Sequence, residues 1–266
     1  MKKIVLLCVS LFVGTLSASA WTIVFDKAAL LVAAQNYNDK TKELVVHYVG
    51  NDFTKPLYYL EELRKGGKLL ESEGWHRLHL DENLQPVATD ENDAYVQIEK
   101  ALEVVRNHKQ YNKSEVSHAI QTVMNLVIDM HNIGNVTLAA IPKSANDFQI
   151  NTAKGSANGR PPHIFQDSWR NFWSHRFKTH HGAYSAQMYA EDLTIMFADK
   201  KAEYMSGTLR DWAVDVGKYT TSVYEVLERN NGNFLHATVQ AHEPLYMSTV
   251  ARAGFRIAAL LNDALK

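Results

Sequence analysis

Apolar residues recur at intervals of three and four positions along several long segments, and this periodicity constrains the fold more than any other feature of the chain. Between residues 94 and 106, apolar side chains stand at positions 94, 98, 101, 102 and 105, on one face of an α-helix. Further helices are expected over residues 21–36, 57–70, 114–130, 183–199, 206–227 and 244–265. The 266 residues include only 13 Gly and 6 Pro, whereas an all-β chain needs a tight turn about every ten residues. The sequence therefore predicts an all-α fold.

The remaining local signals predict a single helical domain over residues 21–266. The segment 114–130 is longer and more apolar than the others, as expected of a helix at the centre of a bundle. Ser114, together with Ser117, suits the N-cap of this helix. Residues 146–162 contain Asn, Ser, Gly, Lys and two prolines with little periodicity, so we expect a long surface or functional loop there.

The first twenty residues are typical of a secretory signal peptide and not of the folded domain. Lys2 and Lys3 precede an apolar run over residues 4–13, and small residues then lead to Ala20. The apolar run is shorter than the about 20 residues that a membrane-spanning helix needs, and no other stretch approaches that length. Cleavage after Ala20 would make Trp21 the new N-terminus.

The charges and the single cysteine exclude several classes of protein. The 28 basic and 29 acidic residues give a net charge of −1, so no global basic field indicates nucleic-acid or membrane-surface binding. Cys8 is the only cysteine and leaves with the signal peptide, so the mature chain has neither a disulfide nor a thiolate metal ligand. An export signal without disulfides favours a periplasmic or extracellular bacterial protein with no membrane span.

Several short segments follow one another in an order that resembles a known family. They are Trp21, Tyr59-Leu60-Glu61-Glu62-Leu63-Arg64, Trp75-His76, the stretch 119–131, Asn171-Phe172-Trp173 and the stretch 253–262. This order resembles the zinc-dependent single-strand nucleases of the nuclease S-one/P-one type. Those proteins are secreted helical phosphodiesterases that share a fold with bacterial zinc phospholipase C. The resemblance covers nearly all of the expected mature chain.

The resemblance implies an endonuclease or 3′-nucleotidase that hydrolyses phosphodiester bonds of single-stranded nucleic acid. The family holds three zinc ions in a cleft, and the N-terminal Trp supplies its amine and carbonyl as ligands. Clustered zinc ions lower the pKa of bound water and clamp both oxygens of an in-line phosphoryl displacement. A free amine at Trp21 would require cleavage of the signal peptide directly before that residue.

Matched residue by residue, part of the family's zinc site is retained. The resemblance assigns catalytic roles to Asp129, the bridging carboxylate, and to Arg64, the phosphate-contacting arginine. The positions that match metal ligands are Trp21, Asp26, Glu61, His76 and Asp129. Two of these are replacements, because Asp26 stands where the family has His and Glu61 stands where it has Asp.

Four further ligand positions carry residues that bind zinc poorly or not at all. Asn125, Asn135 and Arg170 stand where the family has His, and Ser174 stands where it has Asp. A guanidinium at a former ligand position suggests that a fixed charge has replaced the cation. We therefore expect a reduced number of zinc ions or none. Hydrolysis of single-stranded DNA, RNA or 3′-nucleotides is expected to be absent or far below that of a typical member.

Simpler interpretations exist for many of these residues. Trp75, Trp169 and Trp173 suit a core or a cleft wall, and stacking on a base or sugar is the alternative. His163 and His175 are possible substitute ligands, whereas a solvent-exposed position is favoured for His79 and for the pair His180-His181. The apolar pattern around Asp129 predicts that this carboxylate is buried and therefore paired, with Arg170 as the expected partner if zinc is absent.

Three hypotheses follow. The first is an active zinc phosphodiesterase with a reduced metal set, which acts on single-stranded nucleic acid or nucleotides. The second is a non-catalytic relative that keeps the cleft and binds an anionic or phosphorylated ligand through Arg64 and Arg170. The third is a structural protein that binds another protein and no small ligand.

Overall fold

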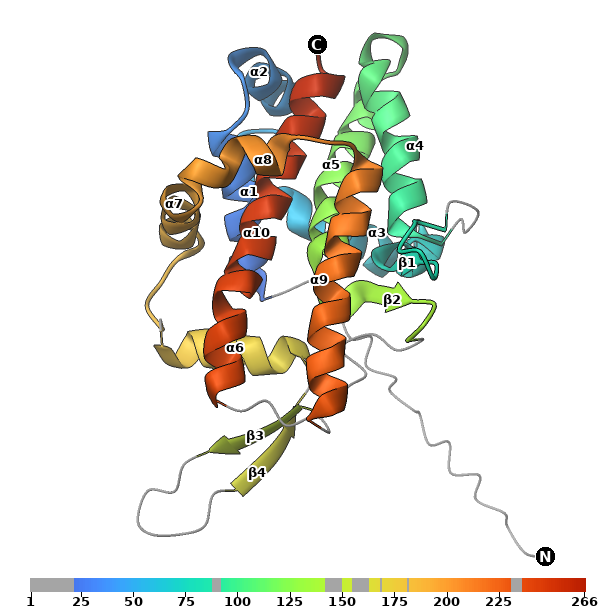
Figure 1. Ribbon diagram of the computed structural model, residues 1–266. Coiled ribbons are helices and arrows are strands. Elements are labelled where there is room, and N and C mark those ends of the chain that lie inside the picture. Colours follow the sequence, from blue (N-terminus) through green and yellow to red (C-terminus); the bar gives the residue numbers. More distant parts are fainter. Residues whose placement is uncertain are drawn as a thin grey trace, which may run out of the picture.

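The fold is given by a computed structural model, which describes residues 22–87, 92–141, 150–154, 163–167, 169–180, 182–230 and 236–266. These residues are mostly helical (Figure 1), which confirms the predicted helical class. The expected signal peptide, Trp21 and most of the expected loop over 146–162 lie outside the described residues. Within the described ranges, no helix is both long enough and apolar enough to cross a membrane.

The elements follow the chain in this order. The α-helices are α1 (Ile23–Gln35), α2 (Asp39–Tyr48), α3 (Tyr59–Lys65), α4 (Ala94–Arg106), α5 (Lys113–His131), α6 (Trp169–His180), α7 (Ala186–Met196), α8 (Lys201–Met205), α9 (Leu209–Arg229) and α10 (His236–Ala264). Short 3-10 helices are η1 (Lys55–Tyr58), η2 (Leu70–His76), η3 (His108–Gln110), η4 (Ile133–Asn135) and η6 (Ala198–Lys200). The strands are β1 (Leu78–Leu80), β2 (Val136–Leu138), β3 (Ile150–Lys154) and β4 (His163–Asp167).

Helix α5 lies at the centre of the bundle, as the apolar character of its sequence predicts. Every residue from Ala119 to His131 is buried, so the helix has neighbours on all faces of its C-terminal two-thirds. Helices α4 and α10 make its most extensive contacts, and α2, α3 and η1 cover further faces. A helix in this position buries any polar side chain that it carries near its C-terminal end, and Asp129 is one of these.

The two ends of the described chain are packed together through α1 and α10. Gly254 of α10 lies so close to α1 that a Cβ atom there would stand 2.6 Å from both the Ala29 carbonyl oxygen and the Val32 Cβ. The Asn262 side chain donates to the Asn36 carbonyl at 3.0 Å and accepts from the Asn38 amide at 2.9 Å. The apolar stripe in residues 250–261 therefore serves close helix packing.

Aromatic side chains fill the space between α1, α6 and α10. Trp173 of α6 stacks on Tyr246 of α10 with ring centroids 4.7 Å apart, and it also stacks on Phe177. Phe25 of α1 meets Phe177 edge to face at 4.6 Å. Trp169 is buried as well, so the interpretation of these tryptophans as core residues is confirmed.

Two short sheets accompany the helices. β1 and β2 pair in parallel, with Leu78 opposite Val136 and Leu80 opposite Leu138. Because β1 directly follows η2 and β2 directly follows η4, this pairing holds the ends of both 3-10 helices beside the end of α5. β3 and β4 form an antiparallel pair with Ile150 opposite Asp167.

Three expectations about helix ends and loops are corrected. The N-cap of α5 is Asn112 and not Ser114, because Asn112 and Glu115 form a reciprocal capping box. Strand β3 lies inside the segment expected to be loop, where pairing with β4 supplies the order that local periodicity lacks. Helix α10 begins eight residues before the expected start and continues through Pro244, because its packing on α1 and α5 outweighs the lost backbone hydrogen bond.

Candidate functional site

The centre of the candidate site is a chain of hydrogen bonds that joins Arg64, His76 and Asp129. Arg64 Nη1 donates to His76 Nε2 at 2.8 Å, and His76 Nδ1 lies 2.6 Å from Asp129 Oδ2. His76 and Asp129 are buried, whereas Arg64 is half-buried. The resemblance described above predicts all three residues in one centre, and the structure brings them together.

Three elements position these side chains. Arg64 lies in the last turn of α3, which ends where Gly66 follows, and Arg64 Nη1 also donates to Ser72 Oγ at 3.0 Å. His76 is the final residue of η2, and Asp129 lies in the last turn of α5. The second oxygen of the Asp129 carboxylate accepts a hydrogen bond from Asn135 Nδ2 at 3.2 Å.

The hydrogen bonds define which imidazole nitrogen carries the proton. A guanidinium can only donate, so Nε2 of His76 must accept from Arg64. The proton of His76 is therefore on Nδ1, where it is donated to the Asp129 carboxylate. In this arrangement both ring nitrogens are hydrogen-bonded, and the imidazole ring of His76 bridges the Arg64 guanidinium and the Asp129 carboxylate.

Arg64 occupies the nitrogen of His76 that a zinc ion would use. Zinc binds the lone pair of an imidazole nitrogen whose other ring N–H is commonly donated to a carboxylate; here Nδ1 donates to Asp129, and the lone pair of Nε2 accepts from Arg64. Among the described residues, no group of three or more His, Cys, Asp or Glu side chains is arranged to hold a metal ion. The residues present therefore make a hydrogen-bonded centre.

The structure places the other predicted site residues in different surroundings. Glu61 forms an ion pair with Lys65 at 2.7 Å, one helical turn away on the exposed side of α3. The Asn125 side chain donates to the Leu57 carbonyl at 2.9 Å, which ties α5 to η1. Asp26 is completely buried in the first turn of α1, and Ser174 is half-buried in α6.

Some predictions lie outside the described residues or are corrected. Trp21 and the side chains of Arg170, His163, His175 and His180-His181 are not among those described. Asp129 is buried as predicted, and the described partners of its carboxylate are His76 and Asn135. His79 is not simply solvent-exposed, because its Nδ1 lies 3.0 Å from Asp93 Oδ2.

A second buried polar cluster was missed by the sequence analysis. Arg256 of α10 donates to His131 Nε2 at 2.8 Å and to Asp215 Oδ2 at 2.6 Å. Arg252, one turn earlier, also pairs with Asp215 and lies over the Tyr204 ring. The signal was present in the sequence, since Arg252 and Arg256 interrupt an otherwise apolar stretch of the last helix.

The electrostatics of this second cluster keep His131 neutral and Asp215 ionised. Burial, and after it the charge of Arg256, lowers the pKa of His131 from 6.5 to about 3. Burial alone would raise the pKa of Asp215, but the charges of Arg256 and Arg252 outweigh it and leave the pKa lowered. The neutral imidazole can then accept from Arg256 while its Nδ1 donates to the Val127 carbonyl at 2.8 Å.

The shift at His131 predicts a loss of stability in mild acid. Below pH 6.5 the unfolded chain takes up a proton at His131, whereas the folded protein does so only near pH 3. The stabilisation is therefore complete above pH 6.5 and declines as the pH falls. Between pH 6.5 and pH 5 we expect a loss of about 2 kcal/mol from this residue.

Urea denaturation at pH 7 and pH 5 measures this effect. A His131→Gln variant should show a smaller difference between the two pH values than the unmodified protein, by about 2 kcal/mol. The exposed residue His47 provides the matched control, and His47→Gln should leave the difference unchanged. Equal pH dependence in the His131→Gln variant and the unmodified protein would show that another group is responsible.

Comparison of the sequence with protein-family models and with curated proteins gave no match.

Proposed function

We propose that the protein is an exported, non-catalytic relative of the zinc-dependent single-strand nucleases, and that it binds single-stranded nucleic acid or a nucleotide through phosphate. The observation that carries this proposal is the chain of hydrogen bonds from Arg64 through His76 to Asp129. It places a permanent cation beside the residues that would otherwise hold a metal ion. A fixed charge can attract phosphate, but it supplies neither an ionised water nor a clamp on the leaving oxygen.

Arg64 has the donors that such binding needs. Within the described part of the chain, its hydrogen bonds to Ser72 and His76 all come from Nη1. The donors on Nε and Nη2 therefore remain for a ligand, and the side chain is only half-buried. Two adjacent N–H donors of a guanidinium match two oxygens of a phosphate group.

A binding experiment tests this proposal. A chain that begins at Trp21 and has no N-terminal tag is titrated into a fluorescently labelled single-stranded oligonucleotide and into a labelled nucleotide. Arg64→Gln should weaken binding by about tenfold or more, as expected for loss of a charged hydrogen-bond pair. Arg77→Gln removes the same charge from an exposed position nearby in the sequence and should weaken binding much less.

The test also includes a check on folding. Arg64→Lys keeps the charge but loses the planar fork, so it should retain the fold and bind with intermediate strength. Equal binding by the Arg64→Gln and Arg77→Gln variants would contradict the assignment of Arg64. Absence of binding by the unmodified protein would contradict the proposed function itself.

An active zinc phosphodiesterase is the second candidate function. It is favoured by the burial of Asp26, His76 and Asp129, three residues at positions that match family ligands. This candidate predicts hydrolysis of single-stranded DNA or 3′-nucleotides that zinc supports and a chelator abolishes. Such activity in the unmodified protein would replace the non-catalytic proposal.

Reconstruction of the family's ligands separates the two candidates further. The substitutions are Asn125→His, Asn135→His, Arg170→His and Ser174→Asp, combined in one chain. If the centre has lost its metal by substitution, this variant should take up zinc, measured by metal analysis, before it gains measurable hydrolysis. If the unmodified protein already binds zinc firmly, the four changes should add little.

A further inference from the structure

Polar side chains on one face of α5 bond to the stretch of chain that carries Arg64. The members of this face are separated by seven and four residues, which is close to whole numbers of helical turns, and their partners all lie within residues 57–76. They are His118, Asn125 and Asp129, which bond to Tyr59, Leu57 and His76 respectively. Hydrogen bonds therefore hold η1, α3 and η2 on the central helix at three points.

Helix α3 depends on such bonds for its orientation. It has seven residues, fewer than a helix needs to be stable alone in water, and Leu60 is its only buried residue. One buried side chain leaves a short helix free to turn about that point. The bond of Tyr59 to His118 holds the first residue of α3, and the bonds of Arg64 to Ser72 and His76 hold its last turn. Together these bonds fix the direction of the helix.

The bond between Tyr59 and His118 joins two neutral, half-buried groups. The Tyr59 hydroxyl lies 2.8 Å from His118 Nδ1, and the ring centroids are 5.5 Å apart. Burial raises the pKa of Tyr59 and lowers the pKa of His118, so both side chains are uncharged near pH 7. Tyr59 and Arg64 are five residues apart, about 8 Å along the helix axis. Any effect of this pair on Arg64 is therefore carried by α3.

We propose that Tyr59 and His118 are positioning residues for the phosphate contact at Arg64. Their hydrogen bond fixes the direction of α3, and α3 in turn holds the Nε and Nη2 donors of Arg64 in the geometry that a phosphate group needs. The role of this pair rests on the function proposed above, because the ligand of Arg64 is the one named there.

A double-mutant cycle tests the pair with the labelled single-stranded oligonucleotide as the probe. Tyr59→Phe and His118→Leu should each weaken binding by about three- to tenfold, the effect of one lost hydrogen bond. The double variant should bind no more weakly than either single variant, because both changes remove the same bond. Additive losses would show that the two residues act separately and would contradict the proposal.

Two further variants keep or spare the bond. His118→Asn places an amide at the position of Nδ1, and an amide can either accept from or donate to the Tyr59 hydroxyl. This variant should bind the oligonucleotide nearly as well as the unmodified protein. Tyr58→Phe makes the same chemical change as Tyr59→Phe at the adjacent half-buried tyrosine and should leave binding unchanged.

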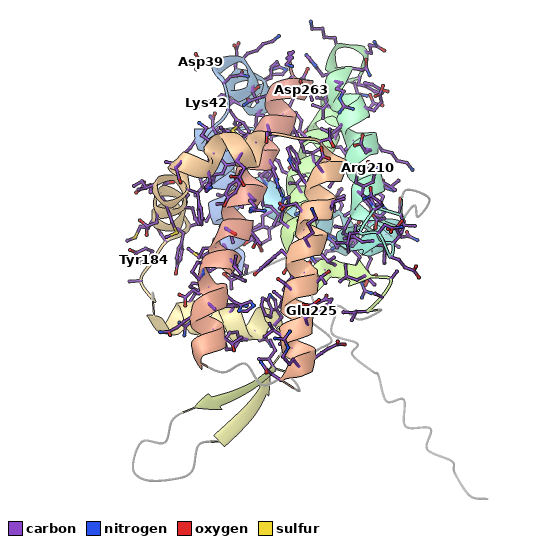
Figure 2. The ribbon with its side chains drawn as sticks, viewed as in Figure 1. Asp39, Lys42, Tyr184, Arg210, Glu225 and Asp263 are labelled. Carbon is purple, nitrogen blue, oxygen red and sulfur yellow. The ribbon has the colours of Figure 1, made fainter. Side chains whose placement is uncertain are left out.

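A variant on another helix controls for a general loss of stability. Thr208→Ala removes the N-cap of α9, the helix on which Figure 2 labels Arg210 and Glu225. The main neighbours of α3 are α5, η1 and η2, and α9 is not among them. Thr208→Ala should lower the unfolding midpoint about as much as Tyr59→Phe and leave oligonucleotide binding unchanged.

Nitrogen NMR of the His76 ring gives a readout that needs no ligand. His76 Nε2 accepts from Arg64 at 2.8 Å, so its resonance reports whether Arg64 keeps its place. The resonance should shift in Tyr59→Phe and in His118→Leu, and it should stay unchanged in Thr208→Ala. A loss of stability alone would not produce this pattern.

The outcomes separate this proposal from the proposed function. If the unmodified protein binds the oligonucleotide and Tyr59→Phe binds it equally well, the positioning role is wrong while the proposed function stands. If Thr208→Ala weakens binding as much as Tyr59→Phe, the effect is one of general stability and the positioning role is wrong. If the unmodified protein binds neither oligonucleotide nor nucleotide, the proposed function is wrong, and an unchanged His76 resonance in Tyr59→Phe overturns the positioning role as well.

Discussion

Replacing Gly254 with alanine should lower the free energy of unfolding by about 3 kcal/mol, the upper part of the range for overpacked cores. The new Cβ would stand 2.6 Å from the Ala29 carbonyl oxygen and 2.6 Å from the Val32 Cβ. Both atoms belong to the rigid body of α1, so α10 must shift away along its contact with that helix. Urea denaturation followed by circular dichroism measures the change.

Gly217 is the matched control for this substitution. It also lies inside a helix, and a Cβ there would stand 2.6 Å from Leu80 Cδ1. The end of a leucine side chain can rotate away, and alanine is favoured over glycine in a helix by up to about 1 kcal/mol. Gly217→Ala should therefore stay within about 1 kcal/mol of the unmodified protein. Equal losses of stability at both glycines would show that helix α1 shifts as easily as the end of the Leu80 side chain.

Replacing Asp215 with asparagine should cost about 3 kcal/mol, because it leaves the Arg256 guanidinium buried without a counter-charge. The Arg256 side chain is 5% exposed, whereas that of Asp215 is 36% exposed. We take the lower end of the range for broken buried pairs because water can reach this carboxylate. The loss of stability should depend little on salt, since the Arg256 guanidinium is buried away from counterions.

Asp263 provides the control for Asp215. Its carboxylate pairs with Lys266, and both side chains are exposed. Exposed pairs contribute about 0–1 kcal/mol, so Asp263→Asn should have little effect. A loss at Asp215 as small as that at Asp263 would mean that Arg256 gains water when its partner is removed.

The helices with strong periodicity are the part of the fold that the sequence predicts well. The segment 94–106 coincides with α4, whose apolar positions face α5. Prediction fails where a tertiary contact decides the outcome. Pro244 marks an expected helix start, yet α10 continues through it. Residues 150–154 form a strand because β4 pairs with them, and the local sequence pattern does not predict this pairing.

The candidate site shows the same division. The family resemblance associates His76 with Asp129, and the structure places them in contact. The resemblance does not predict the ion pair between Glu61 and Lys65. Residues four apart on a helix are neighbours, so the Lys65 ammonium is available to the Glu61 carboxylate locally. The cluster of Arg256, Asp215 and His131 joins three helices, so only the two arginines in an otherwise apolar stretch of the last helix hint at it.

The packing of α1 against α10 has a consequence for the synthesis of the protein. The bonds of Asn262 to Asn36 and Asn38 span 226 and 224 residues, and α5 also packs against α10. A chain that emerges from the ribosome therefore presents α1 and α5 long before their shared partner has been synthesised. Contacts of such long range close slowly and leave apolar surface exposed until they form. The packing of α1 and α5 is therefore completed only after α10 has been synthesised.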